Sequence, residues 1–379
     1  MHRSHFLDAI KEIFQQHAIC AILGPRQCGK TTLAKDFIRV NQQLQVHFFD
    51  LENPFDLGRL ENPMLTLASL KGVVIIDEIQ RRPDLFPNLR VLADTTPLQF
   101  LILGSASRAL IEQSSESLAG RIGYLELTPF SLREVEHIDK LWTRGGFPKS
   151  YLANTEQQSA RWRTFYIRTF LEQDIPNLGI KIAPRSLHRF WMMLAHHHGQ
   201  LFQASELGRS LGVSHHTTKK YLDILEGTFM IRTLQPWYEN IAKRQVKTVK
   251  VYFRDAGIFH TLLGLGDKAA LERHPKLGAS WEGFALEEVI RHYQVPSEHA
   301  YFWRTQAGAE IDLLIDHQGT KRGFEFKYTE RPKVTPSIRI ALKELHLDQV
   351  TIVYPGPHSY ALDDRVFVMS ISDLYSGTV

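Results

Sequence analysis

Short apolar runs alternate with helix-like stretches over the first third of the chain. The runs at residues 18–24, 46–51, 73–76 and 98–104 are separated by segments such as 30–40, whose apolar residues are spaced as on one face of a helix. Continuous apolar strands separated by helices are typical of a parallel sheet that is covered on both faces. The pattern therefore predicts an α/β domain with a parallel sheet.

The apolar spacing changes along the rest of the chain. It is helical through 161–175 and 184–199, and it indicates a helix, a turn, a second helix and a strand over 204–234. A run of aromatic and β-branched residues at 249–253 is expected to begin a last region. That region is a second α/β domain, with strands near 301–304, 309–316, 323–328 and 349–354 and helices around 280–293 and 337–347.

Composition excludes several classes of protein. The chain has 379 residues, of which 43% are hydrophobic and 23% are charged, so it is expected to be globular rather than fibrous or disordered. Its apolar runs are far shorter than the roughly 20 residues of a membrane-spanning helix, and the first residues lack a secretion-signal pattern. Cys20 and Cys28 provide neither a disulfide framework nor a cysteine-based zinc site. We therefore expect a cytoplasmic protein with no membrane partner.

Positive charge is concentrated in one segment. The formal net charge is only +4, but nine Lys or Arg stand against four Asp or Glu between residues 203 and 254. The net charge is too small to indicate nucleic-acid binding over the whole surface, but the local excess favours nucleic-acid binding by this segment.

A phosphate-binding loop joins the first apolar run to the first helix. Its sequence fits GxxxxGK[ST] in the required position between a strand and a helix. Glycines let backbone N–H groups surround phosphates, the lysine reaches the β and γ oxygens of ATP, and the threonine hydroxyl binds Mg²⁺. The predicted ATP-binding residues are Gly24, Pro25, Arg26, Gln27, Cys28, Gly29, Lys30, Thr31 and Thr32.

Two acids follow the apolar run at 73–76. Asp77 is expected to bind Mg²⁺ together with Thr31, and Glu78 to polarise the attacking water, which predicts hydrolysis of ATP as well as binding. The apolar run at 98–104 is expected to form a strand that ends before Ser105. The Ser105 hydroxyl is then placed to contact the γ-phosphate, although serine is also common in turns.

The phosphoryl group carries negative charge that calls for an arginine. Arg121 is the first candidate, supplied by the same chain or by a neighbouring one, and Arg26 competes with it. An ordinary surface ion pair is the alternative for both. If one chain supplies its arginine to ATP bound by a neighbouring chain, the active form is a homo-oligomer, such as a hexameric ring.

Four segments, GPRQCGKTTL, VVIIDEIQ, LILGSAS and SLAGRIGYLELTPFSLREV, together resemble a family of prokaryotic AAA+-like ATPases whose C-terminal domain has long been described as of unknown function. The resemblance covers most of the chain. It implies an ATPase core, a helical lid, a winged helix and a restriction-endonuclease-like domain in that order. We place these at residues 1–138, 139–184, 185–245 and 246–379.

The helix, turn and helix expected over 204–234 form a helix-turn-helix segment, whose second helix would enter the major groove of DNA. The residues expected on that face are Ser214, His215, Thr217, Thr218, Lys219 and Lys220, and residues 227–237 are expected to form the strand pair of the wing. Winged helices also serve as protein-interaction modules or only as packing modules, and the local charge favours DNA. The histidines at 196–198 are expected to be solvated or to compensate a helix end rather than to bind metal.

Carboxylates of the last domain have the spacing of a nuclease site. Glu325 and Lys327 share one face of a strand, and Asp312 lies in the strand before it, so two acids and a lysine could hold Mg²⁺ and activate water against a phosphodiester. The restriction-endonuclease resemblance implies Glu282 as the acid of the preceding helix, with Glu287 as the alternate. A solvated strand face with a modest ion pair is the competing interpretation. Trp303, Arg304 and Glu310 lie alongside and are expected to guide the substrate.

These observations predict an ATP-dependent DNA-processing nuclease that uses ATP and Mg²⁺ and acts on duplex or branched DNA such as Holliday junctions. The alternatives are a nucleotide-dependent switch that recruits partners and a DNA motor for translocation or branch migration, each without nuclease activity.

Overall fold

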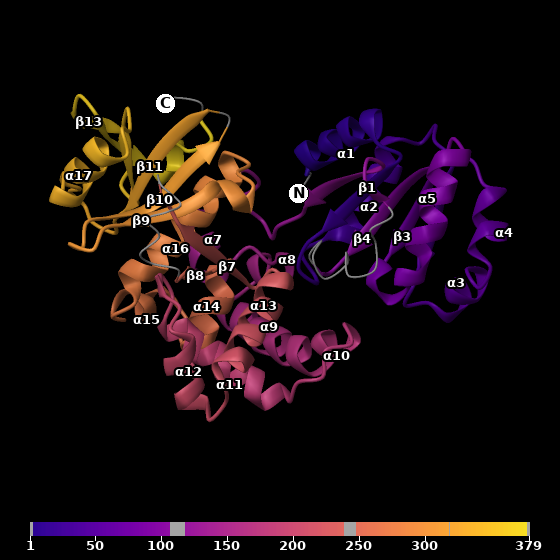
Figure 1. Cartoon of the computed structure of the whole chain (residues 1–379), viewed down its shortest axis with the longest axis horizontal. Helices are drawn as coiled ribbons and strands as arrows, with labels where there is room; N and C mark the ends of the chain where they lie inside the picture. The colour runs from indigo at the N-terminus through magenta and orange to yellow at the C-terminus, as the bar shows by residue number, and fades with distance from the viewer. Residues whose placement is uncertain (1–2, 107–117, 239–247, 318, 377–379) are drawn as a thin grey trace. The chain divides into compact units, whose positions relative to one another are not determined.

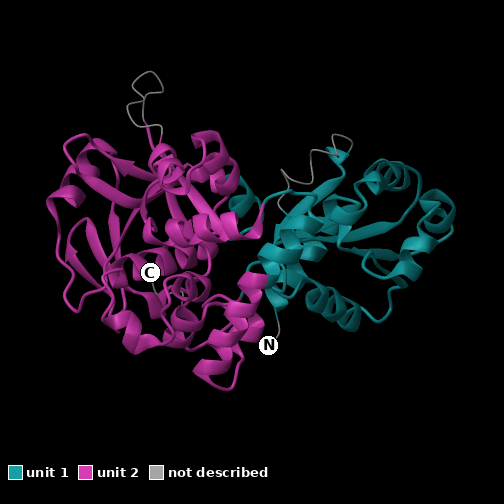
Figure 2. Ribbon diagram, turned by 90° about the horizontal axis from the view of Figure 1, so that it is seen from below, with its two compact units in different colours: residues 1–129, 169–182, 223–230 teal, residues 130–168, 183–222, 231–379 magenta. Residues whose placement is uncertain are grey.

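The computed structural model describes residues 3–106, 118–238, 248–317 and 319–376. The chain divides into two compact units, which are coloured separately in Figure 2. Unit 1 contains residues 1–129, 169–182 and 223–230, and unit 2 contains residues 130–168, 183–222 and 231–379. No helix among the described residues is both long and apolar enough to cross a membrane.

Unit 1 is built on a five-stranded parallel sheet (Figure 1). Its strands are β1 (Ile19–Leu23), β2 (Val46–Asp50), β3 (Val73–Asp77), β4 (Gln99–Gly104) and β5 (Ile122–Glu126), and their order is β2-β3-β4-β1-β5. The strands coincide with the predicted apolar runs, apart from β5 at the edge. The predicted α/β fold with a parallel sheet is therefore confirmed.

Helices cover both faces of this sheet. Alternate residues of β1 enter different apolar clusters: Ile19 belongs to the cluster that includes Leu89 of α5, whereas Cys20 belongs to the cluster that includes Leu7 of α1 and Phe37 of α2. The helices described in unit 1 include α1 (Ser4–Gln16), α2 (Lys30–Val40), α3 (Pro54–Arg59), α4 (Pro63–Ala68), α5 (Phe86–Thr95) and α10 (Ile175–Asn177), with short turns Ile79–Arg81 and Pro83–Leu85 and a π-helical turn, η4 (Phe170–Asp174). Burial on both faces explains why the strands have continuous apolar sequences.

Unit 2 begins with helices, as the apolar spacing predicts. They are α7 (Ile138–Arg144), α8 (Pro148–Tyr151), α9 (Glu156–Thr169), α11 (Pro184–His196), α12 (Ala204–Leu211) and the first part of α13 (His215–Gly227), whose residues from 223 on belong to unit 1. Later in the chain come α14 (Ala256–Leu262), α15 (Lys268–Glu272), α16 (Leu277–His292) and α17 (Pro336–Glu344). Gly212 ends α12 with a left-handed conformation, φ 72°, which glycine adopts at little cost. The turn between α12 and α13 therefore lies where the sequence predicts it.

A nine-stranded sheet runs through unit 2 in the order β13-β14-β12-β11-β10-β9-β7-β8-β6. The strands are β6 (Gln200–Leu201), β7 (Ile231–Pro236), β8 (Lys250–Phe253), β9 (Ala300–Arg304), β10 (Glu310–His317), β11 (Thr320–Phe326), β12 (Val350–Tyr354), β13 (Tyr360–Asp363) and β14 (Val366–Ser370). The four strands expected in the last region are all present, and β13 and β14 follow them.

Two expectations about this sheet are wrong. Residues 227–237 contain one strand, β7, and not a strand pair, because the chain turns at Phe229 with φ 63° before the strand begins at Ile231. The antiparallel partner of β7 is β8, which was expected in the next domain and which also pairs antiparallel with β6. In addition, β7 pairs parallel with β9, so one continuous sheet crosses the predicted boundary at residue 245.

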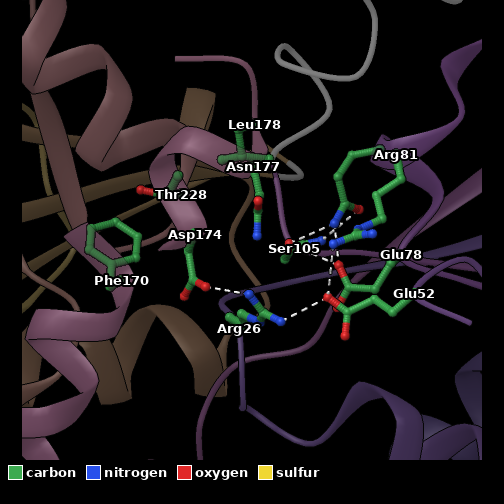
Figure 3. Close-up of a pocket in the computed structure, with 11 residues that line it drawn as sticks. Arg26, Glu52, Glu78, Arg81, Ser105, Phe170, Asp174, Asn177, Leu178 and Thr228 are labelled. Atoms are coloured by element: carbon green, nitrogen blue, oxygen red, sulfur yellow. Dashed lines mark hydrogen bonds and ion pairs between the residues drawn. The ribbon is translucent and has the colours of Figure 1, made fainter. Parts of the chain in front are cut away.

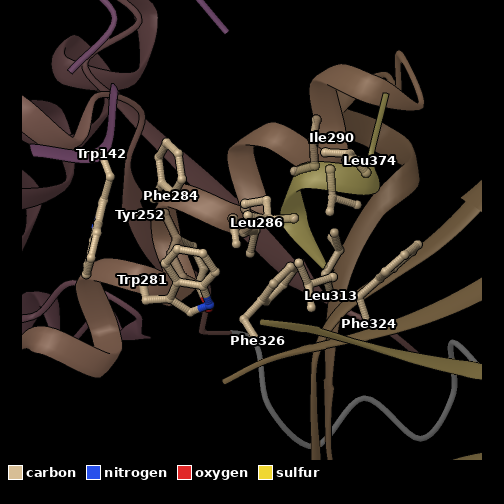
Figure 4. Close-up of a cluster of buried hydrophobic side chains, with 14 of the residues drawn as sticks. Trp142, Tyr252, Trp281, Phe284, Leu286, Ile290, Leu313, Phe324, Phe326 and Leu374 are labelled. Atoms are coloured by element: carbon tan, nitrogen blue, oxygen red, sulfur yellow. The ribbon is translucent and has the colours of Figure 1, made fainter. Parts of the chain in front are cut away.

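The largest core of unit 2 lies between α16 and the sheet (Figure 4). Trp142 of α7 and Trp281 of α16 meet edge to face, with ring centroids 5.4 Å apart, and Leu313 and Phe324 pack from β10 and β11. The opposite face of β10 packs on α17. The sheet is thus covered on both faces here, as an α/β domain requires.

A buried ion-pair network crosses this core at Glu287 of α16. Arg232 of β7 reaches it with both Nε to Oε1 (2.5 Å) and Nη2 to Oε2 (3.2 Å), while Arg254 and Arg291 approach within 3.6 and 3.8 Å. Burial raises the pKa of the Glu287 carboxyl, but the arginines outweigh burial and hold it at about 2. A carboxyl whose pKa is lower in the folded state than in the unfolded state stabilises the fold at any pH above its unfolded-state pKa. The ionised Glu287 therefore makes its full contribution to stability at neutral pH.

Replacing Glu287 by Gln is expected to destabilise unit 2 by about 3–5 kcal/mol at pH 7, because it leaves buried guanidinium groups without their counter-ion. The difference from the wild type should shrink as the pH falls from about 4.5 towards 2, where the wild-type carboxylate is itself protonated. Urea unfolding followed by tryptophan fluorescence measures this, since all six tryptophans lie in unit 2. Glu272→Gln, which removes an exposed acid 3.9 Å from Lys268, is the control; equal effects of the two changes would contradict the prediction.

Candidate functional site

The loop after β1 has the geometry of a phosphate-binding loop, and its two glycines are required by the structure. A Cβ atom on Gly24 would lie 2.1 Å from the carbonyl oxygen of Leu127, and Gly29 has φ 107°. Of the other predicted loop residues, Pro25 is buried, Gln27 adopts φ 62°, and Thr32 is exposed in the first turn of α2. The loop is thus fixed by close backbone approach rather than by side-chain packing alone.

The side chains of the loop already have partners within the chain. Lys30 is buried, and its Nζ donates to the carbonyl oxygens of Gly24 (2.9 Å) and Pro25 (3.0 Å). The Cys28 thiol is buried against the carbonyl of Leu127, at 3.3 Å, and burial raises its pKa. Lys30 therefore lies inside the loop, where phosphate oxygens would compete with the two carbonyls for its ammonium group.

Arg3 supports the loop from outside and was not identified from the sequence. It precedes α1, is buried, and donates to the carbonyl oxygens of Cys28 (3.2 Å) and Thr128 (2.8 Å). An isolated arginine far from any motif gives no sequence signal for such a contact.

Strand order brings the predicted catalytic residues to one edge. Because β4 lies between β1 and β3, the loop after β1, Ser105 after β4 and the acids after β3 all meet at the carboxyl end of the sheet. Thr31 Oγ1 donates to Asp77 Oδ2 at 2.6 Å, and burial raises the pKa of the Asp77 carboxyl. A hydroxyl and a carboxylate oxygen in contact are suited to hold Mg²⁺, which keeps most of its water ligands.

Glu78 belongs to a small polar network. Its backbone is left-handed, φ 58°, and its carboxylate accepts a short hydrogen bond from Gln80 and a longer one, 3.4 Å, from Ser105 Oγ. Gln80 Nε2 also donates to Ser105 Oγ at 2.9 Å. Gln80 had been assigned no role from the sequence, although it follows the two acids in the same motif.

These residues line one pocket of unit 1, shown in Figure 3. Arg26 extends into it and pairs with Glu52, at 2.9 Å, and with Asp174 of the π-helical turn. Asn177, Leu178 and Thr228 complete the lining together with Phe170 and Arg81. None of the residues from 169–182 or 223–230 was predicted for the site, because only the tertiary fold brings them to the loop.

Arg121 lies away from this pocket. It immediately precedes β5, at the amino end of the sheet, and it makes a bidentate ion pair with Asp94, at 2.6 and 2.9 Å. The phosphate loop lies at the carboxyl end. The prediction that Arg121 acts on ATP bound to its own chain is therefore wrong, and a role towards a neighbouring chain stays a prediction.

In unit 2, the structure brings together the four predicted nuclease residues. Lys327 Nζ lies 2.7 Å from Glu325 Oε2 and 3.8 Å from Asp312 Oδ2, and the backbone N–H of Phe326 donates to Asp312 Oδ2 at 3.1 Å. Burial and then the charge of Asp312 raise the pKa values of both Glu325 and Glu282. The pairing of β10 with β9 is irregular between Ile311 and Leu314, around Asp312, and such irregularities are frequent next to active sites.

The choice between two glutamates of α16 follows from their partners. Glu282 accepts a hydrogen bond from the Tyr252 hydroxyl at 2.6 Å and interacts electrostatically with Asp312. Glu287, the alternate, is instead occupied by the arginine network of the core. Glu282 is therefore the acid that belongs to the cluster.

Lys250 of β8 is a cluster residue that sequence reasoning missed. Its ammonium group is buried, forms an ion pair with Glu310 and lies 4.0 Å from Glu282 Oε1. Burial lowers the pKa of Lys250, but Glu282, Asp312 and Glu310 outweigh this and raise it.

Of the three residues expected alongside the cluster, Glu310 is thus paired with Lys250, and Arg304 is partly exposed, 3.8 Å from Glu310. Trp303 packs in the second core cluster of unit 2, on the side of α17. A role for Trp303 in guiding substrate is therefore wrong.

A magnesium ion at this cluster would rely on few protein ligands. Among the described residues, no group of three or more His, Cys, Asp and Glu side chains is arranged to hold a metal ion. Asp312 and Glu325 supply carboxylate oxygens on neighbouring strands, and one or two carboxylates with water are the usual protein ligands of Mg²⁺. The residues present therefore fit Mg²⁺ bound mainly through water.

The helix-turn-helix face is largely accessible. His215, Lys219 and Lys220 are exposed. Ser214 is also exposed, and its Oγ accepts from the Thr217 N–H at 3.2 Å, which caps the amino end of α13. Thr218 is fully buried and donates to the carbonyl oxygen of Ala204 at 2.9 Å. The expectation that Thr218 contacts DNA is therefore wrong.

The charge excess between residues 203 and 254 is smaller at the surface than in the sequence. Arg232, Lys250 and Arg254 are all committed to ion pairs with Glu287, Glu310 or Glu282 inside unit 2. Lys243, Arg244 and Lys247 lie outside the described residues. The exposed cations described on this segment are Arg209, Lys219 and Lys220.

One of the three consecutive histidines also differs from expectation. His198 is buried, its Nδ1 accepts from the Phe253 N–H at 3.0 Å, and burial lowers its pKa to about 3. It is a neutral core residue and not a solvated one, whereas His196 is exposed.

Comparison with known proteins divides the chain into three regions. Residues 16–136 match the family model described as AAA domain. Residues 135–269 and 277–374 match two models described as domains of unknown function, DUF8612 and DUF4143. Unit 1 thus contains a P-loop ATPase domain of the AAA type, which agrees with the loop, the acids and Ser105 at the edge of its sheet.

The chain is also similar to proteins of mycobacteria and of an archaeon. It is 47% identical to an uncharacterized protein of Mycobacterium tuberculosis and to one of Mycobacterium bovis, over 94% of this chain and 81% of each relative. Among solved structures, a Walker-type ATPase of Pyrococcus abyssi is similar with a TM-score of 0.48 and 16% identity, over 69% of this chain and 95% of that one.

Replacing Glu78 by Gln is expected to lower the kcat of ATP hydrolysis by at least about 100-fold, because the amide cannot take a proton from the attacking water. Nucleotide affinity should be retained, since glutamine keeps the contacts to Gln80 and Ser105. Phosphate release under saturating ATP measures kcat, and binding of a fluorescent ATP analogue measures affinity. Asp84→Asn, which removes an exposed partner of Arg82 outside the pocket, is the control. Unchanged turnover in Glu78→Gln would show that another group serves as the base.

Proposed function

The chain belongs to the family of the two mycobacterial relatives, with an AAA-type P-loop ATPase domain at its N-terminal end, and we propose that it is an ATP-dependent DNA-processing enzyme whose C-terminal domain cleaves DNA. The observation that carries the proposal is the meeting of Glu282, Asp312, Glu325 and Lys327 in unit 2. Glu282 lies on α16, Asp312 on β10 and Glu325 on β11, and Lys327 directly follows β11.

At the ATPase site, each residue has a chemical task. Lys30 neutralises the β- and γ-phosphates after leaving the carbonyl oxygens that it now contacts. Thr31 and Asp77 would hold Mg²⁺, which neutralises charge on the phosphate oxygens when it is bound. Glu78 accepts the proton of the attacking water, while Gln80 and Ser105 orient the Glu78 carboxylate.

At the carboxylate cluster, burial and the neighbouring Asp312 raise the pKa values of Glu325 and Glu282. The ionised acids are therefore poorly solvated and repel one another. Mg²⁺ at Asp312 and Glu325 would relieve this repulsion and activate water when bound. Lys327 is close enough to both acids to orient the nucleophile and to neutralise the developing charge on the phosphodiester.

The element order supports a winged helix as the DNA-binding part. It runs α11, β6, α12, α13, β7 and β8, with β6 and β7 both antiparallel to β8. In this arrangement α13 enters the major groove, and Lys219, Lys220 and His215 face phosphates and base edges. We extend the proposal to branched DNA such as Holliday junctions, on which an oligomeric ATPase could move along duplex arms while the nuclease cuts.

One observation favours the alternative, a nucleotide-dependent switch or DNA motor without nuclease activity. Lys250 and Lys327 already pair with acids of the cluster, so its carboxylates have cationic partners without a metal. Such a cluster can be purely structural. The two functions differ in a single measurable property, which is Mg²⁺-dependent cleavage.

The nuclease is tested with labelled linear, forked and four-way DNA in the presence of Mg²⁺, with and without ATP. Asp312→Asn and Lys327→Ala are each expected to lower cleavage by at least about 100-fold, while ATP hydrolysis stays within about twofold of the wild type, because these residues lie in unit 2. Asp316→Asn, on the same strand as Asp312 and opposite Lys321, is the matched control and should cleave normally.

The outcome that would reject the nuclease is DNA-stimulated ATP hydrolysis with no cleavage of any of the three substrates. Lys30→Ala separates the roles of the two units: cleavage that survives without ATP hydrolysis would remove the ATP dependence from the proposal and leave the nuclease.

The DNA-binding face is tested by the double change Lys219→Ala, Lys220→Ala. Loss of two phosphate contacts is expected to weaken duplex binding about tenfold near 0.1 M salt and to reduce the slope of log K against log salt by about 2. Lys333→Ala, Lys343→Ala removes two other exposed lysines and is the control. If both pairs weaken binding equally, attraction is non-specific and α13 is not the recognition helix.

A further inference from the structure

Arg26 is held in the ATPase pocket by two carboxylates of its own unit. One guanidinium nitrogen, Nη2, lies 2.9 Å from Glu52 Oε1, and the other, Nη1, donates to Asp174. Figure 3 shows Arg26 between these two acids, on the side of the pocket where Glu78 and Ser105 also lie. An arginine in the phosphate loop is therefore directed towards the reaction site but is occupied by other groups.

Asp174, one of the acidic partners of Arg26, is itself incompletely hydrogen-bonded. It is the last residue of the π-helical turn η4, it is buried, and its second oxygen, Oδ2, has no hydrogen-bond partner among the described residues. Burial raises the pKa of the Asp174 carboxyl, and Arg26 opposes this shift. The pair is thus incompletely satisfied, and π-helical turns of this kind are frequent at functional sites.

The charges of the pocket indicate what would separate the pair. Three acids, Glu52, Glu78 and Asp174, face two cations, Arg26 and Arg81, of which Arg81 lies 3.5 Å from Glu52. A γ-phosphate placed beside Glu78 and Ser105 adds further negative charge to a pocket that is already acidic. Of the two arginines, Arg26 extends from the phosphate loop itself, so it is the cation best placed to meet that charge.

We propose that Arg26 contacts the γ-phosphate of ATP bound to the same chain, and that Asp174 is a positioning residue that holds Arg26 when no γ-phosphate is present. ATP and Asp174 then compete for one guanidinium group, whereas ADP, which lacks the γ-phosphate, leaves the pair intact. Once Arg26 has moved, Asp174 is buried without its counter-ion, an unfavourable state that favours displacement of the turn at 170–174. Nucleotide state is thereby transmitted to residues 169–182.

The proposal rests on the AAA-type ATPase activity of unit 1 and is independent of the nuclease. It also gives the γ-phosphate an arginine from the chain that binds ATP, a place that Arg121 of the same chain cannot take because it lies at the other end of the sheet.

The experiment compares the affinities of a fluorescent non-hydrolysable ATP analogue and of fluorescent ADP in the full chain. Asp174→Asn is expected to strengthen binding of the triphosphate about five- to tenfold, as Arg26 is released, and to change ADP binding by less than about twofold. Arg26→Ala should weaken the triphosphate about tenfold or more, lower kcat about 100-fold or more, and leave ADP nearly unchanged. Arg26→Lys should recover part of the affinity but less of kcat, because lysine lacks the planar fork.

The double variant Arg26→Ala, Asp174→Asn is the decisive comparison. If Asp174 acts through Arg26, removing Asp174 has no further effect once Arg26 is absent. Asp84→Asn controls for loss of one carboxylate elsewhere in unit 1, and Lys30→Ala should weaken both nucleotides. Hydrogen exchange over 169–182 provides a separate readout: the triphosphate, but not ADP, should accelerate it in the wild type and have no effect in Arg26→Ala.

Three outcomes would overturn the proposal. They are an unchanged ratio of triphosphate to ADP affinity in Arg26→Ala, equal effects of Asp174→Asn on the two nucleotides, and an effect of Asp174→Asn that persists in the double variant. A wild-type chain that bound neither nucleotide would contradict the ATPase assignment itself.

Discussion

Burial of carboxylates next to buried cations is the constraint on which much of this protein depends. Removing a carboxylate from water costs several kcal/mol, by an order-of-magnitude estimate, unless a cation or several hydrogen bonds replace the lost solvent. Glu287 in the core of unit 2 has three arginines around it, and its pKa falls. Glu325 has one lysine and a second acid nearby, and its pKa rises. In the first arrangement the arginines outweigh the cost of burying Glu287, whereas in the second burial and the charge of Asp312 outweigh Lys327, so that further positive charge would stabilise the ionised Glu325.

Sequence patterns were sufficient where short segments determine the geometry. The strands of unit 1 could be predicted because burial on both faces makes them continuously apolar. Lys30 and Thr31 begin the helix after β1, and Asp77 and Glu78 lie at the end of β3, so each belongs to a short local motif. Gln80, Asp174 and Lys250 could not be predicted, because each reaches its partners through packing between segments that are distant in sequence. Thr218 shows the opposite error: its neighbours are exposed, but the helical repeat turns it into the interface with α12.

Counting charges along the sequence misjudged the DNA-binding segment for a related reason. A sum of lysines and arginines treats every cation as exposed, yet Arg232, Lys250 and Arg254 compensate acids inside unit 2. Their contribution is to the fold and to the carboxylate cluster. Lys250 and Tyr252 contact the cluster, and both lie on β8, the strand between β7 and β6 in the proposed winged helix. The two predicted domains therefore share a structural element, and a boundary drawn between them divides a single sheet.

The ATPase site illustrates how internal contacts can determine what a ligand signals. Lys30 is hydrogen-bonded to loop carbonyls and Thr31 to Asp77, and Arg26 forms an ion pair with Asp174. Each of these groups, which would contact a bound nucleotide, therefore already has a partner within the chain. Binding is then an exchange of partners, and its free energy is the difference between two sets of contacts rather than the sum of new ones. The partners differ in what they do when released. Carbonyl oxygens of the loop can turn to water at little cost, whereas a buried carboxylate such as Asp174 cannot remain unpaired. A group displaced at such a site has to move or to gain a proton, so the strongest conformational response is expected from the ligand that displaces Asp174.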